Sequence, residues 1–148
     1  MTSQKENSAF KDILDFQQKF NVPFAISPSL LEGEMFEFRT KFLQEELNEF
    51  IEAHQTNDLE LALDSLVDLA VVLYGTAQIM GITHECWVEA WNEVHRANMS
   101  KERAVSASQS KRGTAYDIIK PEGWQAPDHK PILQKYTRLA TLKQDMED

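Results

Sequence analysis

An aspartate lies inside the most apolar stretch of this chain. From Ser65 to Gln78 the sequence reads SLVDLAVVLYGTAQ, and Asp68 is its only charged residue. The stretch has no proline and is long enough to form a helix. Because it is apolar on every side, we expect that helix to be buried nearly all round. An unpaired carboxylate in such a place is strongly destabilising unless a partner or a shifted pKa relieves it. The fold must therefore provide Asp68 with a cation, a proton or an ion-pair partner.

Other acidic residues are placed at helical spacing relative to Asp68 or to one another. Asp64 precedes Asp68 by four residues, so both carboxylates lie on one face of that helix. On the preceding helix, one stripe at steps of three or four residues turns from apolar to acidic and then to small: Phe38, Phe42, Glu46, Glu49 and Ala53. Residues at this spacing share a helix face. The acids therefore point to where a partner helix is expected.

Converging carboxylates from two helices repel one another, and a divalent cation is the simplest relief. Oxygen ligands without cysteine or a helix-spaced histidine pair favour Mg²⁺, or Mn²⁺, over zinc. Two alternatives stay open. The glutamates of the first helix could form a solvated face, and Asp68 could form an ion pair with Arg39 or Lys41.

Apolar periodicity and turn residues predict an all-α fold. A short helical pattern occupies residues 1–20, and long helices are expected at about 30–54, 59–80 and 84–98. Asn57 or Asp58 can cap the helix from residue 59, and Gly81 ends it. Residues 100–110 form a short helix or a loop, 111–131 an ordered tail or loop over the site, and about 132–143 a last helix. Short connections predict a bundle of antiparallel helices.

Length and composition indicate one domain over residues 1–148, with its core at about 30–100. The single cysteine, Cys86, excludes an intrachain disulfide and fits a reducing cytosol. The longest apolar run, 66–82, contains Asp68 and is short for a membrane span. We therefore expect a cytoplasmic protein without a membrane partner.

The net charge of −9 comes from 24 acidic and 15 basic residues. Such a surface repels nucleic-acid backbones, so we expect no nucleic-acid partner. It also repels a free triphosphate, and an acidic protein that handles polyphosphates needs cations in its site.

Several segments together carry a family pattern. They are RTKFLQEELNEF (39–50), DSLVDL (64–69), YGTA (74–77), EVHRANMSK (93–101) and IKPEGWQAPD (119–128). This combination resembles the all-α NTP pyrophosphohydrolase superfamily, especially its MazG-like and phosphoribosyl-ATP pyrophosphohydrolase-like members of the short phage and bacterial type. The resemblance covers about residues 10–130.

The resemblance implies a metal site built from E-x-x-E on one helix and E-x-x-D on the next. Glu46 and Glu49 match the first pair, and Asp68 matches the final aspartate. Ser65 stands where the third ligand is expected, and Asp64 beside it is the natural substitute. The implied metal ligands are thus Glu46, Glu49, Asp64 and Asp68.

A second group of residues is expected to contact the substrate. Asn98 and Lys101 match a segment that approaches the nucleotide phosphates in the family. Lys101, helped by Lys120, would stabilise charge on the leaving pyrophosphate. Trp124 lies in a segment flanked by proline and glycine that could fold over a site and stack on a base.

The implied reaction is Mg²⁺-dependent hydrolysis of a nucleoside triphosphate or dNTP between the α and β phosphates, which gives the monophosphate and pyrophosphate. Glu45 or Glu46 would orient the attacking water. Two alternatives remain: the same chemistry on phosphoribosyl-ATP, and a non-catalytic helical interaction module that kept the fold. The second is suggested by Ser65.

The acidic site needs a cover on its other side. The second long helix is strongly apolar, and Ala70, Gly75 and Ala77 allow another helix to approach closely. We therefore predict a homodimer, or a dimer of dimers.

Overall fold

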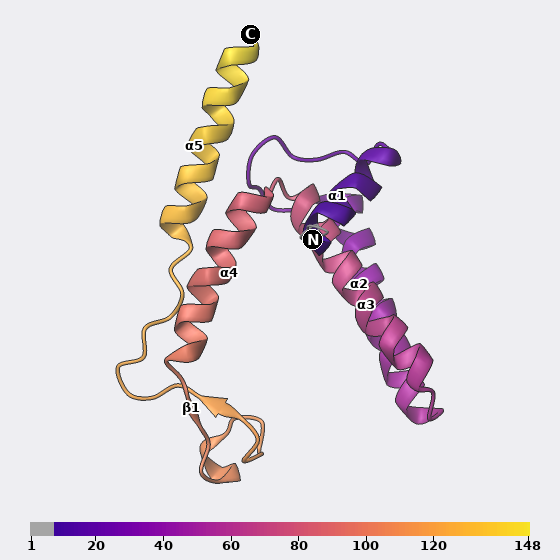
Figure 1. Cartoon of the computed structure of the whole chain (residues 1–148), viewed down its shortest axis with the longest axis vertical. Coiled ribbons are helices and arrows are strands. Elements are labelled where there is room, and N and C mark those ends of the chain that lie inside the picture. Colours follow the sequence, from indigo (N-terminus) through magenta and orange to yellow (C-terminus); the bar gives the residue numbers. More distant parts are fainter. Residues whose placement is uncertain (1–7) are drawn as a thin grey trace, which may run out of the picture. The chain divides into compact units, whose positions relative to one another are not determined.

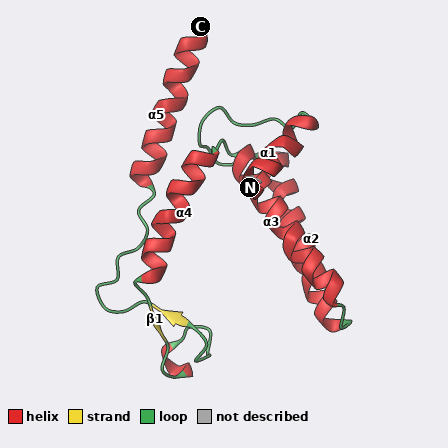
Figure 2. Cartoon of the chain, viewed as in Figure 1, coloured by secondary structure: helices red, strands yellow, loops and turns green. Residues whose placement is uncertain are grey.

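The computed structural model describes residues 8–148, and helices dominate this part of the chain (Figure 1, Figure 2). The helices are α1 (Ala9–Lys19), α2 (Gly33–Gln55), α3 (Leu59–Ile79), α4 (His84–Met99) and α5 (Lys130–Glu147). Two short strands, β1 (Glu102–Arg103) and β2 (Ile118–Ile119), pair antiparallel, and a 3₁₀ helix, Ala107–Gln109, lies between them. The predicted all-α class is confirmed.

The contacts of the chain divide it into two compact units. One unit holds Met1–His84 and Leu139–Asp148, and the other holds Glu85–Arg138. The first therefore contains α1, α2 and α3, and the second contains the strands and most of α4. The expectation of one domain over residues 1–148 stays a prediction.

Helices α2 and α3 form an antiparallel hairpin and lie side by side along their length (Figure 1). The turn between them follows the predicted chemistry: Asn57 takes a positive φ of 54°, and Asp58 Oδ1 accepts a hydrogen bond from Leu61 N at 2.9 Å. This bond satisfies one of the free N–H groups at the start of α3. Small buried residues, Ala53 and Ala62 near the turn, let the two backbones approach closely.

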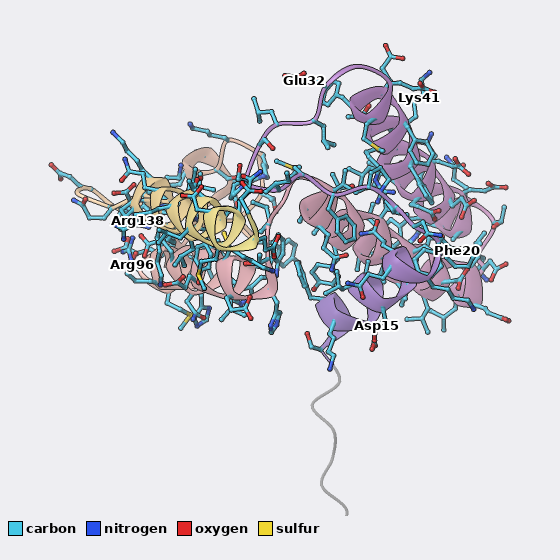
Figure 3. The ribbon with its side chains drawn as sticks, turned by 90° about the horizontal axis from the view of Figure 1, so that it is seen from above. Asp15, Phe20, Glu32, Lys41, Arg96 and Arg138 are labelled. Atoms are coloured by element: carbon cyan, nitrogen blue, oxygen red, sulfur yellow. The ribbon has the colours of Figure 1, made fainter. Side chains whose placement is uncertain are left out.

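Helix α1 packs on the C-terminal half of α3 through a buried polar pair. Gln17 Nε2 donates to Gln78 Oε1 at 2.7 Å, and Gln78 Nε2 donates to the carbonyl oxygen of Phe10 at 2.7 Å. Both amides are buried, so these bonds offset the loss of water. The opposite side of α1 is solvated, and Asp15 projects outward (Figure 3).

The segment between α1 and α2 closes the end of α3. Ala25 N donates to Ile79 O at 3.0 Å, and Ser29 N donates to Met80 O at 2.9 Å. Gly81 follows with a φ of +82°, and a Cβ there would lie 2.5 Å from Ser27 O. Gly81 is thus required both by its backbone conformation and by the close approach of this segment.

In the second unit, the tail that follows β2 is tied to α4. Trp124 Nε1 donates to Ala97 O at 2.8 Å, and Asp128 N donates to Glu93 Oε1 at 3.0 Å. These two bonds hold Trp124 and Asp128 against α4, and the expected ordered tail over residues 111–131 stays a prediction. Whether the tail lies over a site stays a prediction.

The helix boundaries differ from expectation by a few residues. Helix α2 starts at Gly33, and α5 reaches Glu147. The two-residue strands were not predicted, because so short a ladder has no alternating pattern to detect. The expected start of the first helix, residues 1–7, lies outside the described residues. Among the described residues, no single helix is long and apolar enough to span a membrane. Only α3 and α4 taken together, as one bent pair, have the length and composition for a span.

Candidate metal centre

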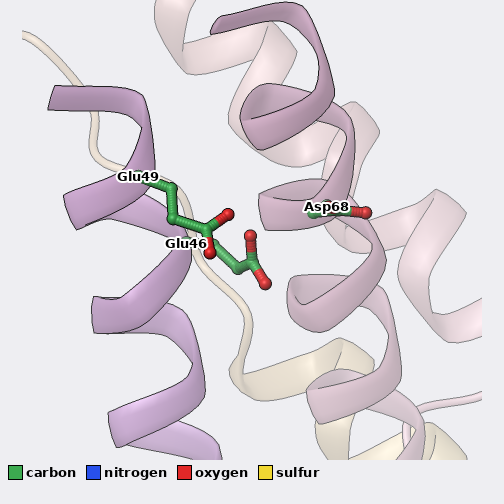
Figure 4. A group of neighbouring side chains, drawn as sticks. All are labelled: Glu46, Glu49 and Asp68. Atoms are coloured by element: carbon green, nitrogen blue, oxygen red, sulfur yellow. The ribbon is translucent and has the colours of Figure 1, made fainter. Parts of the chain in front are cut away.

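Three carboxylates from two helices meet between α2 and α3. Glu46 and Glu49 come from α2, and Asp68 comes from α3 (Figure 4). Each provides a carboxylate oxygen, and these oxygens lie within 4.8 Å of one another. Glu46 is buried with 7% of its surface exposed, and the other two are half-buried. The hairpin thus brings together three of the four predicted ligands.

The electrostatics of this group are unfavourable without a cation. Burial, followed by the charges of Glu49 and Asp68, raises the pKa of Glu46 above its usual range. Burial, followed by the charge of Asp64, raises the pKa of Asp68. Glu46 Oε2 is buried and has no hydrogen-bond partner. A divalent cation would satisfy this oxygen, so the donor set fits Mg²⁺ or Mn²⁺.

The ion-pair alternative for Asp68 does not hold. Arg39 is buried and donates elsewhere: Nε bonds Thr76 Oγ1 at 3.0 Å, and Nη2 bonds Val72 O at 2.8 Å. Lys41 projects into solvent (Figure 3). Within residues 8–148, no lysine or arginine forms an ion pair with any of the three clustered carboxylates. The solvated-face alternative describes Glu45, which is exposed, but not the buried Glu46.

Neither Asp64 nor Ser65 on α3 belongs to the group of three carboxylates, and the two residues differ in their surroundings. Asp64 is exposed and lies outside the group of three, although its charge acts on Asp68. Ser65 is fully buried, and its hydroxyl donates to Leu61 O at 2.7 Å. The serine is therefore turned back onto its own helix, as is common for a hydroxyl within a helix. Asp64 stays the predicted fourth ligand.

The predicted substrate contacts all belong to the second unit. Lys101 Nζ lies 5.3 Å and Lys120 Nζ lies 4.8 Å from the centroid of the Trp124 ring. Asn98 is exposed, and its carbonyl oxygen accepts from Lys101 N at 3.1 Å. Two ammonium groups, one from before β1 and one from the tail after β2, thus lie near the indole of Trp124. The roles of these four residues stay predictions.

Sequence reasoning treated Arg39 only as a partner for Asp68 and missed its actual surroundings. The guanidinium carbon lies 5.7 Å from the ring centroid of Phe38 and 5.5 Å from that of Phe42. The sequence did contain a signal for these surroundings. Phe38 and Phe42 begin the same helix stripe that continues with Glu46 and Glu49, and Arg39 lies next to Phe38 in the chain.

The helical hairpin and its carboxylate cluster agree with the motifs described above, and the family match assigns the chain to the all-α NTP pyrophosphohydrolase superfamily. The family model for phosphoribosyl-ATP pyrophosphohydrolase matches residues 13–98, and the chain belongs to this family. No curated protein matches the chain. The matched region contains all three clustered carboxylates, and the family supports a pyrophosphohydrolase that acts on nucleotides.

Proposed function

We propose that this protein is a Mg²⁺-dependent pyrophosphohydrolase that cleaves a nucleoside triphosphate or dNTP between its α and β phosphates. The observation that carries the proposal is the cluster of three carboxylate oxygens within 4.8 Å, one residue of which has a buried oxygen without a partner. Such a cluster is unfavourable by itself and becomes favourable with a divalent ion. The family match supports nucleotide pyrophosphohydrolysis as the use of that ion.

Glu46, Glu49 and Asp68 would hold the ion, with Asp64 completing the set from the exposed edge. When bound, Mg²⁺ neutralises phosphate charge and polarises the phosphoryl oxygens. Glu45 or Glu46 orients the attacking water and accepts its proton.

The leaving pyrophosphate needs positive charge to stabilise it. Residues 85–138 contain nine lysines and arginines against seven acids, although the whole chain is acidic. Lys101 and Lys120, held over Trp124, are the proposed contacts, with Asn98 beside them. Ammonium groups placed where charge develops stabilise the transition state.

Two alternative functions have specific support. The name of the matched family favours phosphoribosyl-ATP as substrate, and this is equally compatible with the site. A non-catalytic module is suggested by Ser65, whose hydroxyl faces its own helix instead of the cluster. The clustered acids argue against the non-catalytic module, because their mutual repulsion destabilises a protein that binds no metal.

A substrate panel tests these proposals directly. Pyrophosphate release is measured from NTPs, dNTPs and phosphoribosyl-ATP, with Mg²⁺ and with a chelator. We expect release from a nucleotide only with Mg²⁺, and its loss in Glu49→Gln and Asp68→Asn. Glu52→Gln is the matched control, because this glutamate lies on the same helix but is exposed and outside the cluster. No release from any nucleotide, together with no metal binding in calorimetry, would establish the non-catalytic module.

We also propose that the protein is a cytoplasmic homodimer or dimer of dimers whose partner is a small nucleotide and neither nucleic acid nor a membrane. Support for assembly comes from large apolar side chains that α3 leaves exposed: Leu59, Leu63, Leu66 and Leu73. They recur at steps of four, three and seven residues, which is one continuous stripe. An exposed stripe of this kind is typical of a surface that another subunit covers. The cytoplasmic location rests on the absence of any intrachain disulfide, since Cys86 is the only cysteine.

A further inference from the structure

Two phenylalanines lie directly before the carboxylate cluster on α2. Their ring centroids are 5.8 Å apart, and the ring planes are tilted by 45°. Phe38 is 52% exposed, and Phe42 is half-buried. Counting 100° per residue, both lie within 40° of the direction of Glu49 around the helix axis. The two rings therefore lie on the same side of α2 as Glu49, one of the clustered carboxylates.

A cation without a counter-ion lies beside these rings. Arg39 has only 7% of its surface exposed, and its bonds from Nε and Nη2 go to uncharged acceptors. No carboxylate forms an ion pair with it among the residues that the structure describes. A guanidinium has five N–H donors, so two bonds leave donors for another acceptor. Because a desolvated charge is costly, an acceptor supplied by a ligand would stabilise this arrangement.

The spacing along the hairpin fits one nucleotide. Phe42 lies one turn before Glu46, about 6 Å along the axis, and Phe38 lies about 12 Å before it. Arg39 reaches α3 at Val72, which is one turn beyond Asp68. A nucleotide whose phosphates bind at the cluster would therefore place its sugar and base along this side of α2.

We propose that Phe38, Arg39 and Phe42 form the nucleoside subsite of the enzyme. The base stacks on the exposed Phe38–Phe42 surface, and Arg39 donates an N–H to an acceptor atom on the base. This inference rests on the proposed function, and it holds for phosphoribosyl-ATP as well as for a simple nucleoside triphosphate. The subsite places a stacking surface on the same helix as Glu46 and Glu49. Trp124, the stacking residue expected from the sequence, already has two ammonium groups near its ring.

Phe38→Ala tests the subsite, and Phe36→Ala is its matched control. Phe36 lies on the same helix with the same exposed fraction, 52%, but two residues away, and therefore about 200° around the axis. On that side it lines a pocket of about 390 Å³ together with Leu30, Leu31 and Arg39, so the control removes a phenyl ring near the guanidinium but not from the stacking surface. Both side chains are half-exposed, so neither substitution should unfold the chain, and thermal melts verify this.

Each variant is assayed with the preferred nucleotide and with methyl triphosphate, which has the same phosphates but no base. Stacking of a base on an aromatic ring typically changes affinity by about tenfold to a hundredfold. We expect Phe38→Ala to lower kcat/KM for the nucleotide by that factor, mainly through KM, and to leave methyl triphosphate within about twofold. Phe36→Ala should change neither substrate.

An equal loss on both substrates, or equal behaviour of the two variants, would overturn the subsite while leaving the hydrolase proposal intact. If the wild-type protein releases no pyrophosphate, the hydrolase proposal fails and the subsite is judged by binding alone. For that purpose, AMP, GMP, CMP and UMP are titrated in calorimetry without metal. A nucleotide that binds wild-type protein and Phe36→Ala but not Phe38→Ala supports the subsite. Unchanged or absent binding in all three proteins refutes it.

Discussion

Glu46 shows how a single residue defines this site. It lies on the face of α2 that packs against α3, where an apolar residue would ordinarily stabilise the hairpin. Its carboxylate instead meets two others and keeps one buried oxygen without a partner. The residue therefore destabilises the metal-free protein and prepares it for a cation.

This arrangement predicts how metal-free stability changes with pH. The folded-state pKa values of Glu46 and Asp68 are raised above 4.5 and 3.8, their usual values. Their stabilising contribution is therefore fully present below those usual values and is lost as the pH rises through the raised ones. In the presence of a chelator, the contribution of Glu46 and Asp68 should lower the melting temperature as the pH increases from about 4 toward neutrality. Added Mg²⁺ should recover the loss, because it binds only the folded state.

Two variants isolate the cause of this effect. Glu46→Gln should flatten the fall and reduce the recovery by Mg²⁺, because the amide has no charge to repel its neighbours. Glu52→Gln should behave as wild type. The measurement is a melting curve at each pH with chelator or Mg²⁺. A metal-free melting temperature that rises through this range equally in wild type and Glu46→Gln would contradict the assignment.

At the scale of elements, the α2–α3 hairpin and the segment that closes α3 position the cluster. Asp58 sets the start of α3, and small buried residues set the distance between the helices. Backbone bonds from Ala25 and Ser29 then fix the far end. Because the three clustered carboxylates come from both helices, any change that lets one helix slide should separate them.

Gly81→Ala should strongly destabilise this end of the hairpin. Its φ of +82° disfavours any side chain, and the new Cβ would lie 2.5 Å from the backbone oxygen of Ser27. We expect a loss of roughly 2 to 4 kcal/mol, from strain and from displacement of the segment. Gly33→Ala is the control, because its φ is +55° but nothing lies within 4 Å of its Cβ, so strain alone should cost about 1 kcal/mol. Urea unfolding compares them, and equal losses would exclude the contact with Ser27 as the cause.

At the scale of the whole molecule, charge is divided unevenly along the chain. The unit with the carboxylates has six basic and seventeen acidic residues, whereas residues 85–138 have a small excess of basic ones. The carboxylate cluster thus lies in the acidic unit, whose charge attracts cations. This uneven division explains why net charge alone describes neither unit well.

The apolar stripe on α3 predicts the effect of one charge on assembly. Leu66→Glu places a carboxylate in the middle of the stripe, where a second subunit would have to bury it without a partner. We expect light scattering with size exclusion to show a shift from dimer or tetramer toward monomer. Val105→Glu is the control, since Val105 is also exposed but lies outside the stripe. A wild-type protein that is already a stable monomer would refute the assembly.

The sequence by itself determined the helices, a cap at Asn57 or Asp58, the stop at Gly81 and the acidic stripe, because local periodicity and turn chemistry act within a few residues. Tertiary structure decided which acids meet. Glu49 reaches the cluster while Asp64 stays exposed, Ser65 turns to its own helix, and Arg39 bonds α3 instead of an acid. The physical reason is that spacing defines a helix face only to within a fraction of a turn. The rotation and register of α2 against α3, which select the residues that meet, are set by packing along the whole hairpin.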